Sequence, residues 1–387
     1  MEKLTEPHTR RALFAAGGAG LAAAAIAACG GSSSSGGSTG SGGSSGSGGS
    51  SSGSGSGTTS SSALKGTIEF STYPGWIGKH TVADFQKANP GVTVHTDADE
   101  SDFNSQLPKI KAQPGIYSLA LASTYEIQRA ILLGVAQKLD FSSMPNTKYI
   151  DKKYLSTPVN SKGNYFVPTD YGKYGIAVRT DLVPESITSW KDLFSLSSKY
   201  SGKVYWYDFP KDIITAGLLE LGYKANDADR SHIEAAGNAM TKLKPTMGQL
   251  GTNGIGAALL NGSAVISVTY DYDAYAAAQK NKHIKWIIPS EGVPAYLEGW
   301  VALKGGPTAA TQAFMNYALA PKLYADFIKL TNAAGVISAA NRYLPKSLTS
   351  SDILFPSAAE LKRVFFLDFV GQAEAYYDAA YTKFKAA

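Results

Sequence analysis

Aromatic side chains, most of them beside an acidic residue, occur at five places next to stretches with the composition of a strand. These clusters occupy residues 73–76, 123–126, 207–212, 270–273 and 296–298. A carboxylate attracts an ammonium group and accepts charge-assisted hydrogen bonds from its N–H groups. A ring face attracts the same cation by about 0.5–2 kcal/mol and packs against methylene groups. This combination of side chains suits an organic cation.

Two of these clusters also have a purely structural interpretation. Two tyrosines of the 270–273 cluster could pack inward at a strand end, while its two aspartates cap the helix that follows. Trp76 could be a partly buried core residue. Both interpretations stay open here, because composition alone does not separate them from ligand binding.

Side chains typical of catalytic and metal sites form no recognisable pattern beyond the N-terminal segment. The histidines there are scattered, without an HExxH or paired spacing, at His80, His95, His232 and His283. No GxSxG nucleophile elbow follows a predicted strand. Residues 95–100 lack the glycine and distal glutamate of a calcium loop, and residues 251–256 lack the Lys-Ser/Thr of a phosphate loop. We therefore predict a solvated turn and a loop there, and no catalytic residue, cofactor or metal.

The N-terminal segment resembles a bacterial export signal. Residues 9–14 read TRRALF, similar to a twin-arginine motif, and a mildly apolar stretch follows. Residues 26–29 read IAAC, similar to a lipobox, so we predict a signal peptide over 1–28 and a lipidated Cys29. An incidental cysteine in an ordinary signal peptide is the alternative. Cys29 is the only cysteine in the chain, which excludes an intramolecular disulfide and a CxxC motif.

A tract of Gly, Ser and Thr follows Cys29, and we predict a flexible tether over 29–63. Its root-mean-square span is about 30–35 Å, enough to hold a folded body clear of a membrane surface. The net charge of +5 forms no basic run, so the sequence does not indicate a nucleic-acid partner. The remaining chain has mixed composition and is long enough for more than one domain.

Short strands alternate with amphipathic helices through the rest of the chain. Strands are predicted at 67–71, 92–94, 118–122, 175–178, 204–207, 264–269, 284–288 and 300–303. Helices are predicted at 82–88, 125–134, 232–243, 273–280, 308–319, 321–330 and 373–385. This alternation indicates an α/β fold with mostly parallel strands in two sheets. Ligands of such folds bind at the carboxyl ends of strands, where most of the aromatic–acidic clusters lie.

The order of several segments resembles the spermidine/putrescine (polyamine) family of ABC-importer solute-binding proteins over residues 66–386. The most specific segment is VPESITSWKDL at 183–193. The likeness continues at 123–125, 134–140, 165–168, 172–178, 200–203, 221–223, 287–292 and 376–385.

The resemblance implies a two-lobed periplasmic-binding-protein-like fold of type II, whose lobes are joined by crossing strands and close over a ligand. Carried over, lobe 1 comprises 66–172 plus 272–311, and lobe 2 comprises 173–271 plus 312–387. It implies a binding role without catalysis, an ABC permease and ATPase as partners, and a monomer anchored by lipid to the outer face of the cytoplasmic membrane. A ligand-binding sensor or scaffold lipoprotein for a different solute remains the alternative, and a hydrolase that uses an unrecognised carboxylate pair is a third class.

The resemblance also implies the residues that contact the ligand. The aromatic positions of the family fall on Tyr73, Trp76, Tyr125, Tyr270 and Tyr296, and its serine position falls on Ser123. Its acidic positions fall on Asp212, on Asp271 or Asp273, and on Glu298. The chain departs from the family pattern at Pro74, Gly75, Phe209 and Tyr272. The expected ligand is therefore a putrescine- or spermidine-like amine or a related organic cation.

Overall fold

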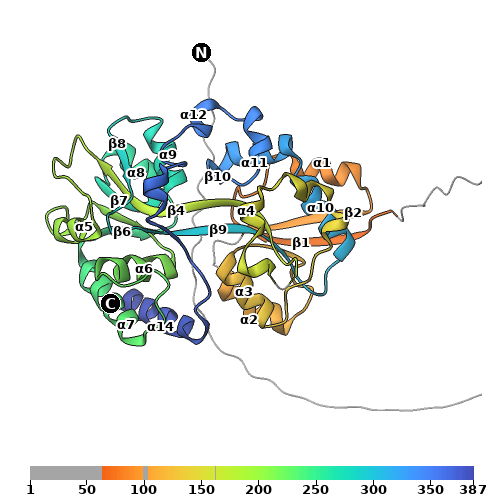
Figure 1. The fold of residues 1–387 in the computed structure, drawn as a ribbon, viewed down its shortest axis with the longest axis horizontal. Coiled ribbons are helices and arrows are strands. Elements are labelled where there is room, and N and C mark those ends of the chain that lie inside the picture. Colours follow the sequence, from red (N-terminus) through yellow and green to blue (C-terminus); the bar gives the residue numbers. More distant parts are fainter. Residues whose placement is uncertain (1–62, 99–102, 162) are drawn as a thin grey trace, which may run out of the picture. The chain divides into compact units, whose positions relative to one another are not determined.

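Two long strands, β4 (Val167–Arg179) and β9 (Val293–Ala302), cross the centre of the fold (Figure 1). The computed structural model describes residues 63–98, 103–161 and 163–387. The predicted signal peptide, Cys29 and nearly all of the predicted tether lie outside the described residues. Residues 61–387 form one unit by their internal contacts.

The described strands form a mixed sheet of eleven strands in the order β2-β1-β3-β9-β4-β7-β5-β6, and β8, β10 and β11 pair with the crossing strands. The other strands are β1 (Gly66–Thr72), β2 (Val92–Ala98), β3 (Leu119–Ser123), β5 (Val204–Tyr207), β6 (Met247–Gly251), β7 (Ile266–Tyr270), β8 (Ile284–Ile287), β10 (Ala334–Gly335) and β11 (Val364–Phe366). Strands β1, β2 and β3 are mutually parallel, as are β5, β6 and β7.

The prediction of two sheets is wrong, because the crossing strands connect the two parallel groups. Residues 167–173 of β4 pair antiparallel with β9, whereas residues 174–178 pair with β7. Strand β9 in turn pairs with β3 through residues 298–302. Every residue of β4 and of β9 is buried, as expected for strands covered on both faces.

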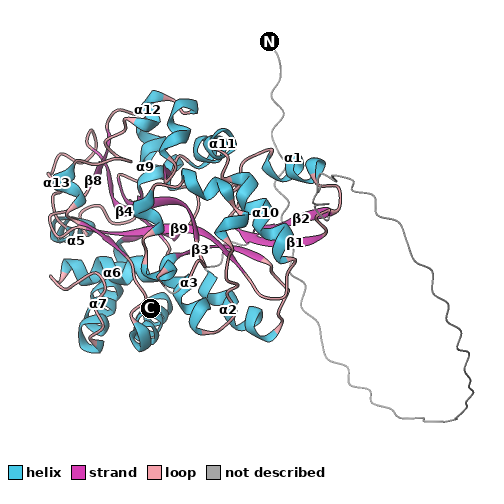
Figure 2. Cartoon of the chain, turned by 45° about the vertical axis from the view of Figure 1, so that its right-hand side comes forward, coloured by secondary structure: helices cyan, strands magenta, loops and turns pink. Residues whose placement is uncertain are grey.

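Helices cover both faces of this sheet (Figure 2). They are α1 (Thr81–Ala88), α2 (Phe103–Ala112), α3 (Thr124–Leu132), α4 (Lys152–Leu155), α5 (Trp190–Ser197), α6 (Pro210–Glu220), α7 (Arg230–Leu243), α8 (Ile255–Asn261), α9 (Asp271–Ala278), α10 (Thr308–Ala318), α11 (Pro321–Thr331), α12 (Lys346–Thr349), α13 (Ala358–Leu361) and α14 (Glu374–Ala386). Among the described residues, no helix is long and apolar enough to cross a bilayer.

Some elements were not predicted, because their sequences lack a clear period. Residues 211–219 of α6 are all buried, so the helix has no polar stripe to reveal it. The glycine-rich segment 251–256, predicted to be a loop, is a loop only at its centre. Gly251 ends β6 and Ile255 begins α8, while Gly254 precedes the helix with a φ of 79°.

Two large hydrophobic clusters define the lobes as used below. The first lobe is built on β1–β3 and includes Phe314, Phe327 and Leu354. The second lobe is built on β5–β7 and includes Trp190, Trp206 and Phe384. This packing differs from the predicted lobe boundaries, which placed 312–387 wholly in lobe 2. Residues 314–354 pack in the first lobe because β9 leads the chain back there, and only the C-terminal segment returns to the second.

Candidate functional site

A cavity of about 220 Å³ lies where the two lobes meet beside the crossing strands. It is lined by Tyr73, Pro74, Trp76, Tyr207, Phe209, Thr252, Asn253, Tyr270, Tyr272, Asp273, Tyr296 and Glu298. The volume is below the range of about 300–1,000 Å³ that is typical of sites for drug-sized molecules. The cavity therefore suits a small ligand.

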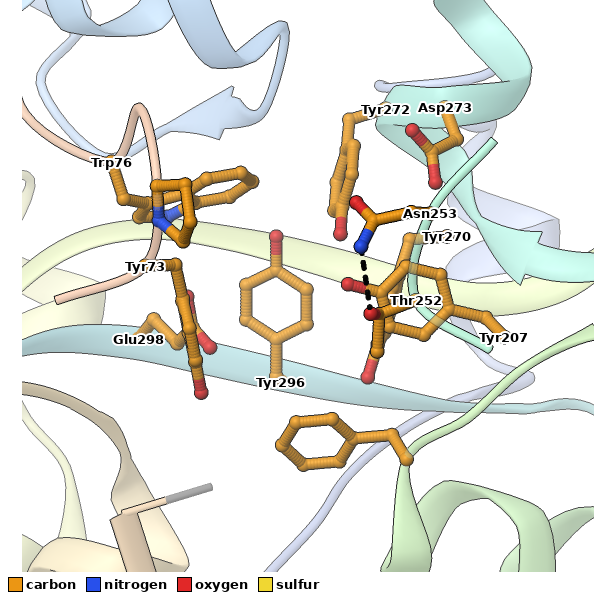
Figure 3. Close-up of a pocket in the computed structure, with 12 residues that line it drawn as sticks. Tyr73, Trp76, Tyr207, Thr252, Asn253, Tyr270, Tyr272, Asp273, Tyr296 and Glu298 are labelled. Carbon is orange, nitrogen blue, oxygen red and sulfur yellow. Dashed lines mark hydrogen bonds between the residues drawn. The ribbon is translucent and has the colours of Figure 1, made fainter. Parts of the chain in front are cut away.

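Aromatic rings from both lobes enclose this cavity. Figure 3 shows Tyr73 and Trp76 on one side, Tyr270 and Tyr272 on the other, and Tyr296 between them. The Trp76 and Tyr272 rings meet edge to face with centroids 5.3 Å apart. Because Trp76 follows β1 and Tyr272 is the second residue of α9, this contact joins the first lobe to the second.

Tyr270, the last residue of β7, is the centre of the aromatic group in the second lobe. Its ring centroid lies 4.9 Å from that of Tyr207 and 5.3 Å from that of Tyr296, both edge to face. It stacks on Tyr272 at 5.5 Å with an interplanar angle of 16°. Such contacts hold the rings in defined orientations relative to one another.

The crossing strands bring two acids side by side: Glu298, which lines the cavity, and Asp170, which is fully buried next to it. Asp170 of β4 is the register partner of Glu298 of β9 in the antiparallel ladder. Thr169 Oγ1 donates a hydrogen bond of 2.8 Å to Asp170, and the Tyr296 hydroxyl donates one of 3.3 Å. Burial raises the pKa of Asp170 to about 7 despite these hydrogen bonds. Burial and the charge of Asp170 raise the pKa of Glu298 well above its ordinary value.

Sequence reasoning missed Asp170. The strand that contains it was predicted only from residue 175, so residues 167–174 were not recognised as buried. The sequence did contain a signal for this site: Asp170 is an acidic residue at the end of a run of apolar and β-branched residues that precedes Tyr171. Thr252 and Asn253 also line the cavity from the segment interpreted only as a loop, and Tyr207 lines it from a cluster already noted.

The two aspartates at the start of α9 have different surroundings, although the sequence analysis could assign the same acidic position to either of them. Asp273 lines the cavity, and its carboxylate accepts a hydrogen bond of 3.1 Å from Thr269 Oγ1. Burial raises the pKa of Asp273 to about 6. Asp271 is fully buried, does not line the cavity and forms an ion pair with Lys173. It also accepts hydrogen bonds from the backbone N–H groups of Lys173 and Tyr272.

Asp212 lies behind the cavity wall as the third residue of α6. It is 2% exposed, and its Oδ1 has no hydrogen-bond partner in the part of the chain that the structure describes. Burial raises the pKa of Asp212 to about 7, although a hydrogen bond with Tyr270 and the charge of Lys211 oppose the shift. Since Tyr270 lines the cavity, Asp212 is connected to the cavity indirectly, by its hydrogen bond with this tyrosine.

Ser123 and Tyr125 are absent from the wall of the main cavity. Ser123 precedes α3 in a capping box, in which its backbone N–H donates a hydrogen bond of 2.8 Å to Glu126 Oε2. Tyr125 lines a smaller neighbouring cavity, and its ring faces the ammonium of Lys211 at 4.5 Å. The predicted site residues that do line the main cavity are Tyr73, Trp76, Tyr270, Asp273, Tyr296 and Glu298.

The acids of this region outnumber the lysines and arginines that neutralise them. In the described part of the chain, Lys173 pairs with Asp271 and Lys211 with Glu374. No ion pair within the described residues includes Asp170, Asp212, Asp273 or Glu298. A buried carboxylate without a compensating charge is costly and stays protonated instead. The site is therefore prepared for a partner that brings positive charge.

A two-lobed α/β fold with an enclosed site between the lobes is the architecture of a solute-binding protein. The family model for bacterial extracellular solute-binding proteins matches residues 80–355. The chain belongs to this family, and its role is to bind a solute outside the cytoplasm.

Its relatives agree with the resemblance found in the sequence. The chain is 25% identical over 323 residues to the spermidine/putrescine-binding periplasmic protein of Escherichia coli (strain K12), covering 83% of this chain and 92% of that protein. It is 26% identical to spermidine/putrescine-binding periplasmic protein 1 of Haemophilus influenzae, covering 84% and 91%. The solved structure of the spermidine/putrescine ABC transporter substrate-binding protein of Streptococcus pneumoniae has a TM-score of 0.68 at 20% identity, covering 83% and 99%. The family predicted from the sequence is thereby confirmed.

Proposed function

We propose that this protein captures a small polyamine, of the putrescine or spermidine type, between its two lobes. The observation that carries the proposal is a set of four buried acids, Asp170, Asp212, Asp273 and Glu298, that form no ion pair within the described residues. Asp273 and Glu298 line the aromatic cavity, and Asp170 and Asp212 lie behind its wall. Ammonium groups would supply the missing charge, and Trp76 and Tyr272 would cover the methylene chain. The names of the E. coli and H. influenzae relatives support the same class of ligand.

Ligand capture requires only binding and closure. Asp273 and Glu298 stand on opposite sides of the cavity, one on α9 and the other on β9. An amine that reaches both ties the second lobe to the crossing strands. The Trp76–Tyr272 contact would then hold the lobes together over the ligand.

The test is a calorimetric titration of the purified full-length chain with putrescine, spermidine and 1,4-butanediol. The diol matches the carbon chain of putrescine but replaces each ammonium with a hydroxyl group. We expect heat of binding and a raised melting temperature with an amine, because a ligand that binds only the folded state stabilises it. The diol should give neither effect. Equal responses to putrescine and the diol, or no response to either amine, would refute the polyamine assignment.

We further propose that the protein is a monomer, anchored through a lipid on Cys29, that delivers its ligand to an ABC permease and its ATPase. The S. pneumoniae structure of the same fold is an ABC transporter substrate-binding protein, which supports this partnership. Metabolic labelling with a radioactive fatty acid should mark the wild-type protein, and Cys29→Ser should abolish the label and release the protein from membranes. A Cys29→Ser variant that keeps the label would refute the anchor.

A further inference from the structure

A lysine of the second lobe occupies one end of the cleft. Lys211 follows Phe209 and Pro210 at the start of α6, and only 4% of its side chain is exposed. Its Nζ lies 4.5 Å from the centre of the Tyr125 ring on α3 of the first lobe. This is the position over an aromatic face that a bound ammonium takes. Tyr125 was predicted to contact the ligand, but the cation over its ring face is the ammonium group of Lys211.

The Lys211 ammonium has the partners of a complete ammonium site. Its Nζ donates hydrogen bonds of 2.6 Å to Glu374 Oε1 and to the carbonyl oxygen of Asp368. It also lies 5.3 Å from the centre of the Tyr377 ring. Glu374 is held in place, because its Oε1 accepts a hydrogen bond of 2.9 Å from the backbone N–H of Val370. A carboxylate, a carbonyl and two ring faces are the groups expected to hold the end of an amine ligand.

This ammonium site adjoins the main cavity. A small cavity of about 40 Å³ is lined by Lys211, Tyr125 and Glu374. Phe209 lines both this cavity and the main one of about 220 Å³. Asp378 of α14, which also lines the small cavity, forms an ion pair of 3.9 Å with Arg129 of α3 between the lobes. A ligand that extends from the main cavity in this direction meets Phe209 and then a buried positive charge.

We propose that Lys211, together with Phe209, limits the length of the amine that the protein accepts. Lys211 supplies the ammonium that a triamine would place at this end of the cleft, so the remaining cavity takes a compact diamine. A second ammonium cannot bind there at the same time, because Lys211 already occupies the carboxylate of Glu374, the carbonyl oxygen of Asp368 and the face of Tyr125. This inference rests on the proposed function and names the ligand class within it: a short α,ω-diamine in preference to spermidine.

The experiment compares wild-type full-length protein with Lys211→Ala by calorimetric titration. For the wild type, the probes are α,ω-diamines of three to eight carbons, and spermidine. We expect the tightest binding with a short diamine and about tenfold weaker binding of spermidine than of putrescine. In Lys211→Ala, Glu374 and Tyr125 become available to a second ammonium. The preference for putrescine over spermidine should then fall by about tenfold or reverse.

Lys242→Ala is the matched control, because Lys242 is an exposed lysine on α7 of the same lobe. Its preference should equal that of the wild type. A wild type that binds spermidine as tightly as putrescine overturns the inference, as does a folded Lys211→Ala with the wild-type preference. If Lys211→Ala does not fold, the diamine series on the wild type decides alone: loss of affinity beyond a short chain supports the limit, and constant affinity overturns it. A wild type that binds no amine instead refutes the proposed function itself.

Discussion

Strand β4 carries two buried charged side chains, Asp170 and Lys173, whose surroundings differ. Lys173 forms an ion pair with Asp271, and its Nζ donates a hydrogen bond of 2.8 Å to the carbonyl oxygen of Leu354. Asp170 instead faces Glu298, a second acid. Lys173 has a partner of opposite charge, whereas Asp170 forms no ion pair within the described residues. Equal burial on one strand is therefore accompanied by an ion pair at one position and by a pair of acids with raised pKa values at the other.

The largest expected effect comes from breaking the structural pair. Lys173→Met leaves the carboxylate of Asp271 buried without its partner, which costs about 3–5 kcal/mol of unfolding free energy. Urea denaturation at pH 7 should show a lower midpoint with an unchanged slope. The exposed Lys242→Met serves as the control. A midpoint equal to that of the wild type would mean that the Lys173–Asp271 pair does not stabilise the fold.

Breaking the acid pair of Asp170 and Glu298 should instead weaken ligand binding without lowering stability. Glu298→Gln removes a charge that the ligand is expected to neutralise, so affinity for putrescine should fall about a hundredfold. Unfolding free energy should stay constant or rise, because a neutral amide replaces a carboxyl group whose charged form is disfavoured by burial and by Asp170. Calorimetry and urea denaturation of the same variant measure both quantities. A loss of stability without a loss of affinity would show that Glu298 is structural, like Asp271.

The stability of the free protein and its affinity for an amine should depend on pH in opposite directions. Burial raises the pKa of Asp170 and Asp212 to about 7 and that of Asp273 to about 6, above the values in an unfolded chain. The free folded state therefore holds more protons than the unfolded state between about pH 4 and 7, so these groups make stability fall as pH rises. An amine needs the charged form, so its affinity should instead increase about 30-fold from pH 5.5 to 8.

Titrations with putrescine at several pH values, in buffers of different ionisation enthalpy, would detect the expected release of protons on binding. The Asp170→Asn variant should show a smaller pH dependence of both affinity and stability. If affinity is the same at pH 5.5 and 8, these acids do not change protonation when the ligand binds.

The smallest expected effect distinguishes the two aspartates of α9. Asp273→Asn should weaken putrescine binding about tenfold with little change in stability, because Asp273 lines the cavity without an ion-pair partner. Asp271→Asn should instead lower the unfolding free energy, because it leaves Lys173 buried beside a neutral amide. Calorimetry and denaturation of both variants would check the assignment. If Asp271→Asn and Asp273→Asn lose the same affinity for putrescine, Asp271 also contributes to ligand binding.

The sequence indicated positions that line the cavity where a side chain stands at the end of a strand or just after it. Tyr73, Tyr270 and Asp273 were found in this way, since the carboxyl ends of strands meet at the cleft. Asp170 was missed because it lies inside a strand, and its place beside Glu298 depends on the pairing of β4 with β9. Tyr125 was assigned to the ligand site from the family resemblance, and nothing in its neighbourhood along the chain indicates that Lys211 lies over its ring.

The sequence by itself determined the α/β alternation, the family and most of the aromatic and acidic positions at the cleft, because these depend on short-range patterns and on the order of segments. Only the tertiary structure decided which acids are neutralised. Lys173 lies 98 positions from Asp271, and Lys211 lies 163 positions from Glu374. Whether a buried carboxylate is neutralised depends on charges within a few ångströms, and the folding of β4, α6, α9 and α14 sets those distances.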